Sequence, residues 1–278
     1  AFMAEPYQGD PANRGVEAMP QEEFRAAVHR AAAAGIAAAV HAIGDAAVAR
    51  ALDVLSDPAL PVAALPHRIE HLQLCPPARL GQAAAAGIVA SMQPAHLITD
   101  WAAADRHWGA RSRTAYAFRS LLRGGQEPRR GTDERESGRV GEGENLRSPA
   151  IAHSPPRPLS PSAVGRPVLA FGSDAPVEPV DPRLAFYAAT TRQDLEGNPP
   201  GGWYPEERMG MEDVLRAYTL GPAIASGASE RQGHLAPGAG ADFVAWDADP
   251  LTTAGEALLR LRCVATVVGG EVVWREGE

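Results

Sequence analysis

The sequence predicts an α/β fold in which parallel strands alternate with helices, followed by a small C-terminal β module. Segments with helical periodicity alternate with short apolar runs between positions 20 and 226. A β-rich tail begins near position 233 and contains a Gly-Gly turn at 269–270. The chain has 278 residues, 45% of them hydrophobic, and can therefore bury a full-sized core. Strands that alternate with helices are normally parallel, because each helix carries the chain back across the sheet.

The first helix and strand are marked by clear end signals. Segment 20–35 begins with Pro and acidic residues and ends in Gly, which predicts a helix. The apolar run 36–42 predicts a buried strand, and Asp45 is a suitable N-cap for a helix over 46–55. The same alternation predicts further strands at 66–74, 88–94 and 167–174, and further helices at 77–87, 112–125, 181–193 and 211–226.

The alternation stops between positions 124 and 167. This stretch is rich in Pro, Gly, Arg, Ser and Glu and cannot form a packed core, so we predict a disordered insert. Unspliced or misread coding sequence is a second interpretation that stays open. The predicted organisation is therefore a barrel part over 1–232, interrupted at 124–167, and a β module over 233–278.

Charge and cysteine content narrow the class of partner. A net charge of −8 argues against nucleic acid and membrane partners, since both need a clustered positive field. A small-molecule substrate is the better expectation, and a homo-oligomer stays open. Cys75 and Cys263 are far apart and match no metal-binding spacing, which favours a reducing, cytoplasmic location. The most apolar run, 31–40, is too short to span a bilayer.

Two histidines and an aspartate lie where predicted strands end. His41 and His71 fall near the ends of the first two strands, 30 residues apart, and Asp174 follows the fourth. Removing 124–167 leaves about two βα units between His71 and Asp174. In (β/α)₈ barrels the functional site is built at these strand ends. Two neutral imidazoles and a carboxylate suit Zn²⁺ or a similar divalent ion, which can ionise a bound water, so hydrolysis is expected.

Each candidate also has a structural interpretation. A lone strand-end histidine is often only hydrogen-bonded, and Asp174 could cap the turn in GSDAP. Strand alternation places Glu70 opposite to His71, which favours a packing or ion-pair role for Glu70. His96, after the third strand, either contacts substrate or is an ordinary loop residue. Trp203 is a weaker substrate-binding candidate, since aromatic residues in loops often only pack locally.

Six strings follow one another in the chain: VHAIGDAAVARALDVL (40–55), RIEHLQL (68–74), IVASMQPAH (88–96), FGSDAPVEPVDP (171–182), WYPEERMGMEDVLRAYTLGPAIAS (203–226) and GHLAPGAGADFVAWDADP (233–250). In this order they resemble the YtcJ-like, amidohydrolase-3 branch of the metal-dependent amidohydrolase superfamily. The resemblance covers nearly the whole chain except 124–167. It implies a partial TIM (β/α)₈ barrel comprising the strand 5 to 8 side, and a C-terminal β module belonging to an incomplete β-sandwich.

The resemblance also implies a function. It predicts a hydrolase of carbon–nitrogen bonds in non-peptide amides, with one or two divalent ions, most simply Zn²⁺, in the complete enzyme. His41 matches the strand-5 histidine of the family, His71 the strand-6 histidine and Asp174 the strand-8 aspartate. In that scheme the metal polarises the amide carbonyl and activates a water, and Asp174 moves the proton of that water to the leaving amine. His71 either binds metal or polarises the carbonyl.

The sequence departs from the family pattern in two ways. Relatives open with an HxH pair on the first barrel strand and place a further ligand, often lysine, near the fourth, whereas this sequence contains no HxH string and no lysine. We therefore expect an N-terminally truncated chain that lacks barrel strands 1 to 4. The alternative is an incomplete or catalytically dead remnant that acts only as a binding or structural protein.

Overall fold

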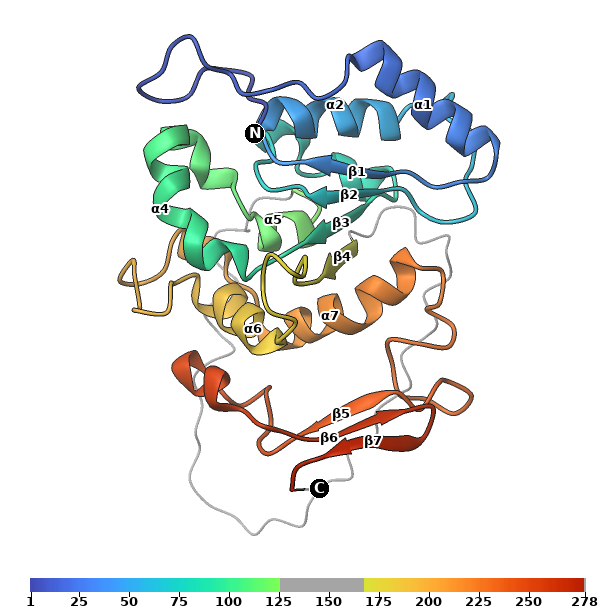
Figure 1. Cartoon of the computed structure of the whole chain (residues 1–278). Helices are drawn as coiled ribbons and strands as arrows, with labels where there is room; N and C mark the ends of the chain where they lie inside the picture. Colours follow the sequence, from blue (N-terminus) through green and yellow to red (C-terminus); the bar gives the residue numbers. More distant parts are fainter. Residues whose placement is uncertain (126–167, 278) are drawn as a thin grey trace, which may run out of the picture.

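The computed structural model describes residues 1–125 and 168–277. Over these residues the chain forms two separate sheets, one of four strands in the order β1-β2-β3-β4 and one of three in the order β5-β6-β7 (Figure 1). Apart from its first two residues, the predicted insert at 124–167 lies outside the described residues. None of the helices in the described part combines the length and apolar character that a membrane span requires.

The four-stranded sheet is parallel throughout, which confirms the predicted α/β class. Its strands are β1 (Ala39–Ala42), β2 (Arg68–His71), β3 (Val89–Met92) and β4 (Val168–Phe171). Each strand pairs in parallel with the next along the chain. All four carboxyl ends therefore lie along one edge of the sheet, and β1 and β4 are its outer strands among the described residues.

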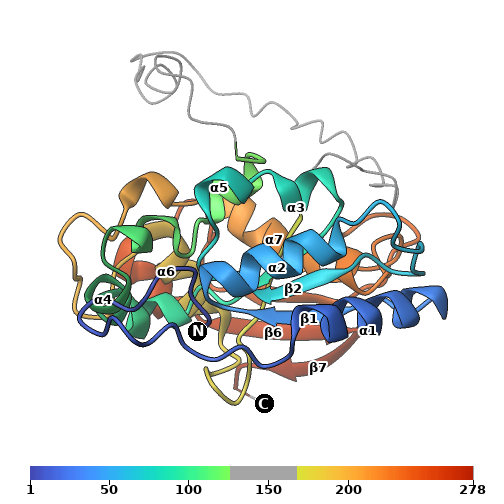
Figure 2. The same ribbon diagram turned by 90° about the horizontal axis from the view of Figure 1, so that it is seen from above.

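Helices connect and flank these strands. The α-helices are α1 (Gln21–Ala33), α2 (Asp45–Leu55), α3 (Gln82–Ala85), α4 (His96–Trp108), α5 (Phe118–Leu122), α6 (Pro182–Thr191) and α7 (Met211–Ala225). The 3₁₀ helices are η1 (Pro77–Arg79), η2 (Gly109–Thr114), η3 (Pro205–Glu207) and η4 (Gly255–Arg260). Helices α1 and α2 lie next to one another beside β1 (Figures 1 and 2).

The structure differs from the local expectations at several points, and the helix expected at 77–87 is divided into η1 and α3. Gly44 precedes α2, and Asp45 is the first residue of that helix, where its Oδ1 accepts N–H groups of Ala4 and Ala46. The helix expected at 112–125 is split, because Tyr116 has a left-handed backbone and its N–H bonds to the carbonyl of Gln73. Helix α4 is not among the predicted elements, although its buried residues Leu97, Ala104 and Trp108 follow a helical spacing.

One large apolar cluster holds the parallel sheet and its helices together. It includes strand residues Ile69 and Met92, and Val48 and Leu52 of α2, all of them fully or almost fully buried. Such a cluster supplies the main favourable term in folding, because it removes apolar surface from water. The strand ends that carry the candidate residues are therefore anchored on a packed core.

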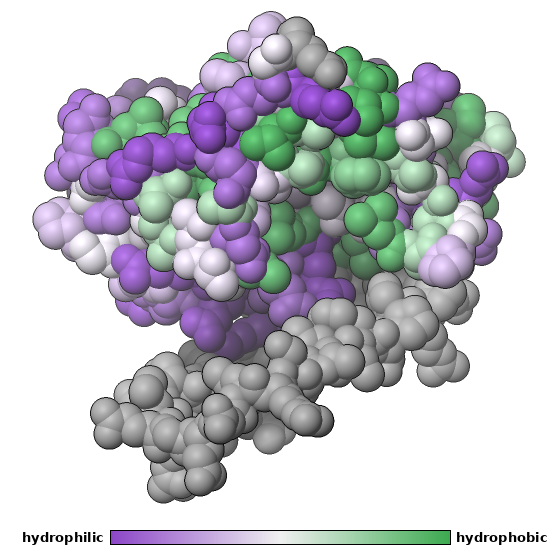
Figure 3. Space-filling model, turned by 90° about the horizontal axis from the view of Figure 1, so that it is seen from below, coloured by the Kyte–Doolittle hydropathy of each residue, from purple (hydrophilic) through white to green (hydrophobic). Residues whose placement is uncertain are grey.

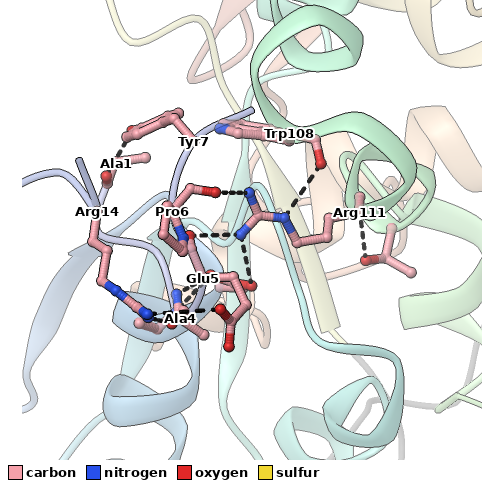
Figure 4. A network of polar contacts seen from close by, with 11 residues as sticks. Ala1, Ala4, Glu5, Pro6, Tyr7, Arg14, Trp108 and Arg111 are labelled. Carbon is pink, nitrogen blue, oxygen red and sulfur yellow. Dashed lines mark hydrogen bonds and ion pairs between the residues drawn. The ribbon is translucent and has the colours of Figure 1, made fainter. Parts of the chain in front are cut away.

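The N-terminal segment is fastened to the far end of α4 by one arginine (Figure 4). Arg111 donates hydrogen bonds to the carbonyls of Glu5 at 2.8 Å and Pro6 at 2.7 Å, and its Nε donates to the carbonyl of Trp108 at 3.2 Å. The hydroxyl of Tyr7 donates to the carbonyl of Ala1 at 2.7 Å. Because the N–H of Ala4 also donates to Asp45, three residues beyond β1, the start of the chain lies beside the carboxyl end of that strand.

Helix α7 approaches β4 so closely that only glycine fits at one position. A Cβ atom on Gly221 would lie 1.9 Å from the carbonyl oxygen of Leu169 and 3.0 Å from Cα of Ala170. Pro222 follows within the helix, so the chain cannot easily shift at this point. The glycine therefore serves the contact between α7 and β4.

The Gly221→Ala variant should lower the free energy of unfolding by about 1–3 kcal/mol, since the added methyl group forces the helix away from the strand. Alanine's better helix propensity, about 1 kcal/mol, offsets part of this cost. Urea unfolding followed by circular dichroism measures the effect, and Thr219→Ala, at an exposed site of the same helix, is the control. A Gly221→Ala protein as stable as the control would contradict this packing.

The C-terminal sheet is antiparallel and comprises β5 (Phe243–Trp246), β6 (Cys263–Val268) and β7 (Glu271–Arg275). Gly269 and Gly270 form the predicted hairpin turn, and both have positive φ. Trp246 contacts Phe186 of α6, which ties this sheet to the rest of the chain. Every residue of β7 is exposed, and hydrophobic patches lie among polar ones on this side of the molecule (Figure 3).

Candidate metal centre

Four of the candidate side chains come from neighbouring strand ends. His41 lies in β1, His71 is the last residue of β2, His96 is the first residue of α4 just after β3, and Asp174 follows β4 by three residues. The strands are parallel and adjacent in the same order, so their carboxyl ends bring these residues to one edge of the sheet.

His71, His96 and Asp174 form the tightest group. Each offers one ligand atom, and these three atoms lie within 4.8 Å of one another. Ligands about 2.0–2.2 Å from a common Zn²⁺ ion must be within about 4.4 Å of each other, so small side-chain adjustments would suffice. His41 lies outside this group, but its ring centroid is 4.6 Å from that of His71, in an edge-to-face arrangement. The rings of His71 and His96 are stacked at 6.0 Å.

An unusual backbone conformation directs His71 into this group. In the register of the sheet His71 pairs with buried Ala42, whereas Glu70 pairs with His41. Regular alternation would therefore place His71 on the face opposite to His41. His71 instead has φ +69°, a left-handed value, and its ring contacts that of His41. Glu70 forms the ion pair that the sequence favours, with Arg68.

Asp174 also has a left-handed backbone, with φ +56°. Non-glycine residues adopt this conformation infrequently, and aspartate tolerates it better than most because its short side chain can bond locally. Its side chain is exposed at the edge of the sheet. Left-handed residues at two of the three clustered positions are a form of strain that occurs often at functional sites.

The donor set fits a divalent cation. Nε2 of His96 is buried and has no hydrogen-bond partner among the described residues. Such an orphaned nitrogen is costly unless something satisfies it, and a cation between His96, His71 and Asp174 would do so. Partial desolvation, followed by the neighbouring His71, lowers the pKa of His41 below its usual value. That shift favours the neutral imidazole form that binds metal.

Gln93 is a site residue that the sequence analysis missed. It directly follows β3, is 6% exposed, and its Oε1 lies 2.8 Å from Nδ1 of His71. The string SMQPAH could have indicated this role, because Gln93 is a polar residue at the end of an apolar strand, directly before a proline.

Trp203 is placed differently from the histidines. Its side chain is 3% exposed and its Nε1–H donates to Oδ1 of Asp105 at 2.9 Å. Its ring packs against Tyr116 and Tyr204 and beneath the guanidinium of Arg192. Within the described part of the chain, its ring contacts and hydrogen bonds include none of the four strand-end residues.

Comparison with known proteins identifies the family. The sequence model of the amidohydrolase family matches residues 1–140 and 164–274. The chain belongs to the amidohydrolase family. The match includes His41, His71, His96 and Asp174, and it confirms the resemblance predicted from the six strings. By family, this amidohydrolase is a hydrolase.

Several relatives of the amidohydrolase are known. YtcJ of Bacillus subtilis (strain 168) is 26% identical over 278 residues, which are 99% of this chain and 44% of YtcJ. An N-substituted formamide deformylase of Arthrobacter pascens is 30% identical over 102 residues, 37% of this chain and 18% of that enzyme. The crystal structure of a metal-dependent hydrolase from Pyrococcus horikoshii OT3 superposes with a TM-score of 0.67 at 28% identity, over 91% of this chain and 42% of that one. The amidohydrolase thus spans less than half the length of each of these relatives.

Proposed function

We propose that this chain supplies part of the divalent-metal site of a hydrolase that cleaves carbon–nitrogen bonds in non-peptide amides. The observation that carries the proposal is the convergence of His71, His96 and Asp174, whose ligand atoms lie within 4.8 Å of one another. The orphaned Nε2 of His96 at the same place adds weight. The relative named as an N-substituted formamide deformylase supports a carbon–nitrogen bond as the target.

The order and direction of the strands support a correspondence between this chain and part of a (β/α)₈ barrel. We propose that β1 to β4 correspond to strands 5 to 8 of a (β/α)₈ barrel, over 1–232, and that 233–278 contributes the three-stranded sheet to a β-sandwich. The support is the parallel, sequential strand order, with the candidate residues at the carboxyl ends.

We assign roles to the strand-end residues as follows. A bound divalent ion, with Zn²⁺ the best match to a nitrogen and carboxylate donor set, supplies Lewis acidity and an acidified water. His71 and Asp174 hold it, as the sequence predicts, together with His96, whose ligand atom lies within 4.8 Å of theirs. His41 lies against His71 and either completes the donor set or contacts the substrate. The exposed carboxylate of Asp174 accepts a proton from water and returns it to the departing nitrogen.

A cavity beside the strand ends offers room for the rest of a substrate. Its volume is about 620 Å³, and it is lined by residues that include Ile43, Gln73, Asp100 and His107. Ile43 and Gln73 each follow a candidate histidine by two residues, and Asp100 lies one turn beyond His96 on α4. We propose that the non-reacting part of the amide occupies this cavity.

Zinc binding and amine release test the proposal together. The purified full chain, stripped of metal and then dialysed against Zn²⁺, should retain about one equivalent per chain, as expected for a single preformed site. The His96→Ala variant should lose this zinc, whereas His234→Ala, which removes a histidine remote in sequence, should keep it. Amine release from N-substituted formamides should depend on the added zinc.

The outcomes separate the possible functions. Absence of retained zinc would refute the metal site. Retained zinc without amine release from formamides or other simple amides would refute the hydrolase function of this chain and favour the alternative, a binding or structural remnant.

A further inference from the structure

We propose that Gln93 is a positioning residue that holds His71 in the tautomer with its proton on Nδ1, so that Nε2 of His71 is free to bind a cation. The inference rests on the proposed function, because it concerns the same site. It adds a residue outside the donor set, and it makes a claim about the metal-free protein that can be measured directly.

The contact between Gln93 and His71 determines the tautomer. Oε1 of Gln93 lies 2.8 Å from Nδ1 of His71, which is a normal hydrogen-bond length. A carboxamide oxygen can only accept a hydrogen bond, so with Oε1 facing His71 the proton lies on Nδ1. In a neutral imidazole the other nitrogen, Nε2, then keeps its lone pair. A histidine side chain in water favours the opposite tautomer, and the contact with Gln93 reverses that preference.

Gln93 is held rigidly enough to do this. Its side chain is 6% exposed, and it lies between buried Met92 at the end of β3 and Pro94, whose ring restricts the backbone. The carbonyl of Gln93 also accepts the N–H of His96 at 3.2 Å, in the turn that begins α4. Gln93 therefore contacts two of the three clustered residues, His71 through its side chain and His96 through its main chain.

We expect Gln93 to strengthen metal binding indirectly, as the hydrogen-bond partner of the metal-binding residue His71. Groups that bond the second nitrogen of a coordinating histidine orient the ring and select its tautomer, and their loss typically weakens metal binding by about 10–100-fold. If the carboxamide were turned the other way, its NH₂ group would donate to Nδ1 and leave a proton on Nε2. That arrangement could not ligate a cation, so the two orientations make opposite predictions.

Nitrogen-15 NMR of the metal-free full chain tests the tautomer. Long-range proton–nitrogen correlations distinguish the two neutral forms, and the His71→Asn variant identifies the His71 signals. At a pH where neutral imidazole dominates, His71 of the wild type should show the pattern for a proton on Nδ1. In Gln93→Met, which has a similar volume but no acceptor oxygen, the pattern should change toward a proton on Nε2. Gln93→Glu retains an acceptor and should retain the wild-type pattern.

A second readout is zinc affinity, measured by competition with a chromophoric chelator. Gln93→Met should bind zinc about 10–100-fold more weakly, and Gln93→Glu should remain close to the wild type. Thermal unfolding of both variants shows that the fold is intact, and Gln93→Glu keeps the test informative if Gln93→Met unfolds.

The failure of this inference can be distinguished from failure of the proposed function. A wild-type His71 with its proton on Nε2, or a tautomer unchanged in Gln93→Met, would overturn the role of Gln93 even where zinc binds. Absence of zinc binding in the wild type would refute the metal site, while the NMR result would still decide whether Gln93 sets the tautomer.

Discussion

Replacing Arg192 with leucine should lower the free energy of unfolding of this amidohydrolase by about 3–5 kcal/mol, because it would leave several buried acceptors without donors. Arg192 is 0% exposed and donates to the carbonyls of Tyr116 at 2.7 Å, Ala115 at 3.2 Å and Trp203. Burial lowers the pKa of its guanidinium to about 10, so the group still carries its charge at neutral pH. It also lies over the rings of Phe118 and Trp203.

The large effect follows from the position of Arg192 between distant segments. Its guanidinium bonds the carbonyls of Ala115 and Tyr116, which lie 77 and 76 positions away in the sequence, and that of Trp203, 11 positions away. A leucine fills part of the volume but satisfies none of the carbonyls. Lysine keeps the charge but cannot reach three acceptors with one planar group, so Arg192→Lys should be destabilised too, by less than the leucine variant.

Urea unfolding of the full chain measures this difference. Arg113→Leu is the matched control, because Arg113 is exposed and its ion pair with Glu206 should contribute less than about 1 kcal/mol. Equal midpoints for Arg192→Leu and Arg113→Leu would show that the buried guanidinium contributes no net stability.

The Asp174→Asn variant should reduce amine release by about 10²–10⁴-fold, the usual contribution of a positioned acid or base. Asparagine has the same shape as aspartate and also tolerates the left-handed backbone at this position, where φ is +56°. It lacks the charge that binds a cation and the basicity that accepts a proton. The side chain is exposed, so the melting temperature should remain close to that of the wild type.

Steady-state rates with a saturating N-substituted formamide and excess zinc would test this expectation. Asp213→Asn, an exposed carboxylate on α7, is the control and should leave the rate unchanged within about twofold, since surface substitutions have small effects. An Asp174→Asn protein that hydrolyses formamide at the wild-type rate would remove Asp174 from the proposed reaction.

Several parts of the site could be predicted from the sequence because they depend on local signals. The apolar runs that end near His41 and His71 mark strands, and parallel strands place their carboxyl ends together. Other parts could not. Helix α4 lacks the start signals that mark α1, because its first turn contains no acidic residue, whereas Glu22 and Glu23 stand in the first turn of α1. Without that helix, the sequence favours neither of two interpretations of His96, a substrate contact or an ordinary loop residue.

By itself, the sequence determined the alternation of helices and strands, the hairpin at Gly269 and Gly270, and membership of the amidohydrolase family. These follow from periodicity, turn chemistry and ordered motifs, all of which lie along the chain. Only the tertiary structure decided that His96, rather than His41, brings a ligand atom within 4.8 Å of those of His71 and Asp174, and that Gln93 bonds to His71. The reason is physical: a left-handed backbone at His71 breaks the alternation of the strand, and contacts between strands depend on how the sheet packs rather than on spacing.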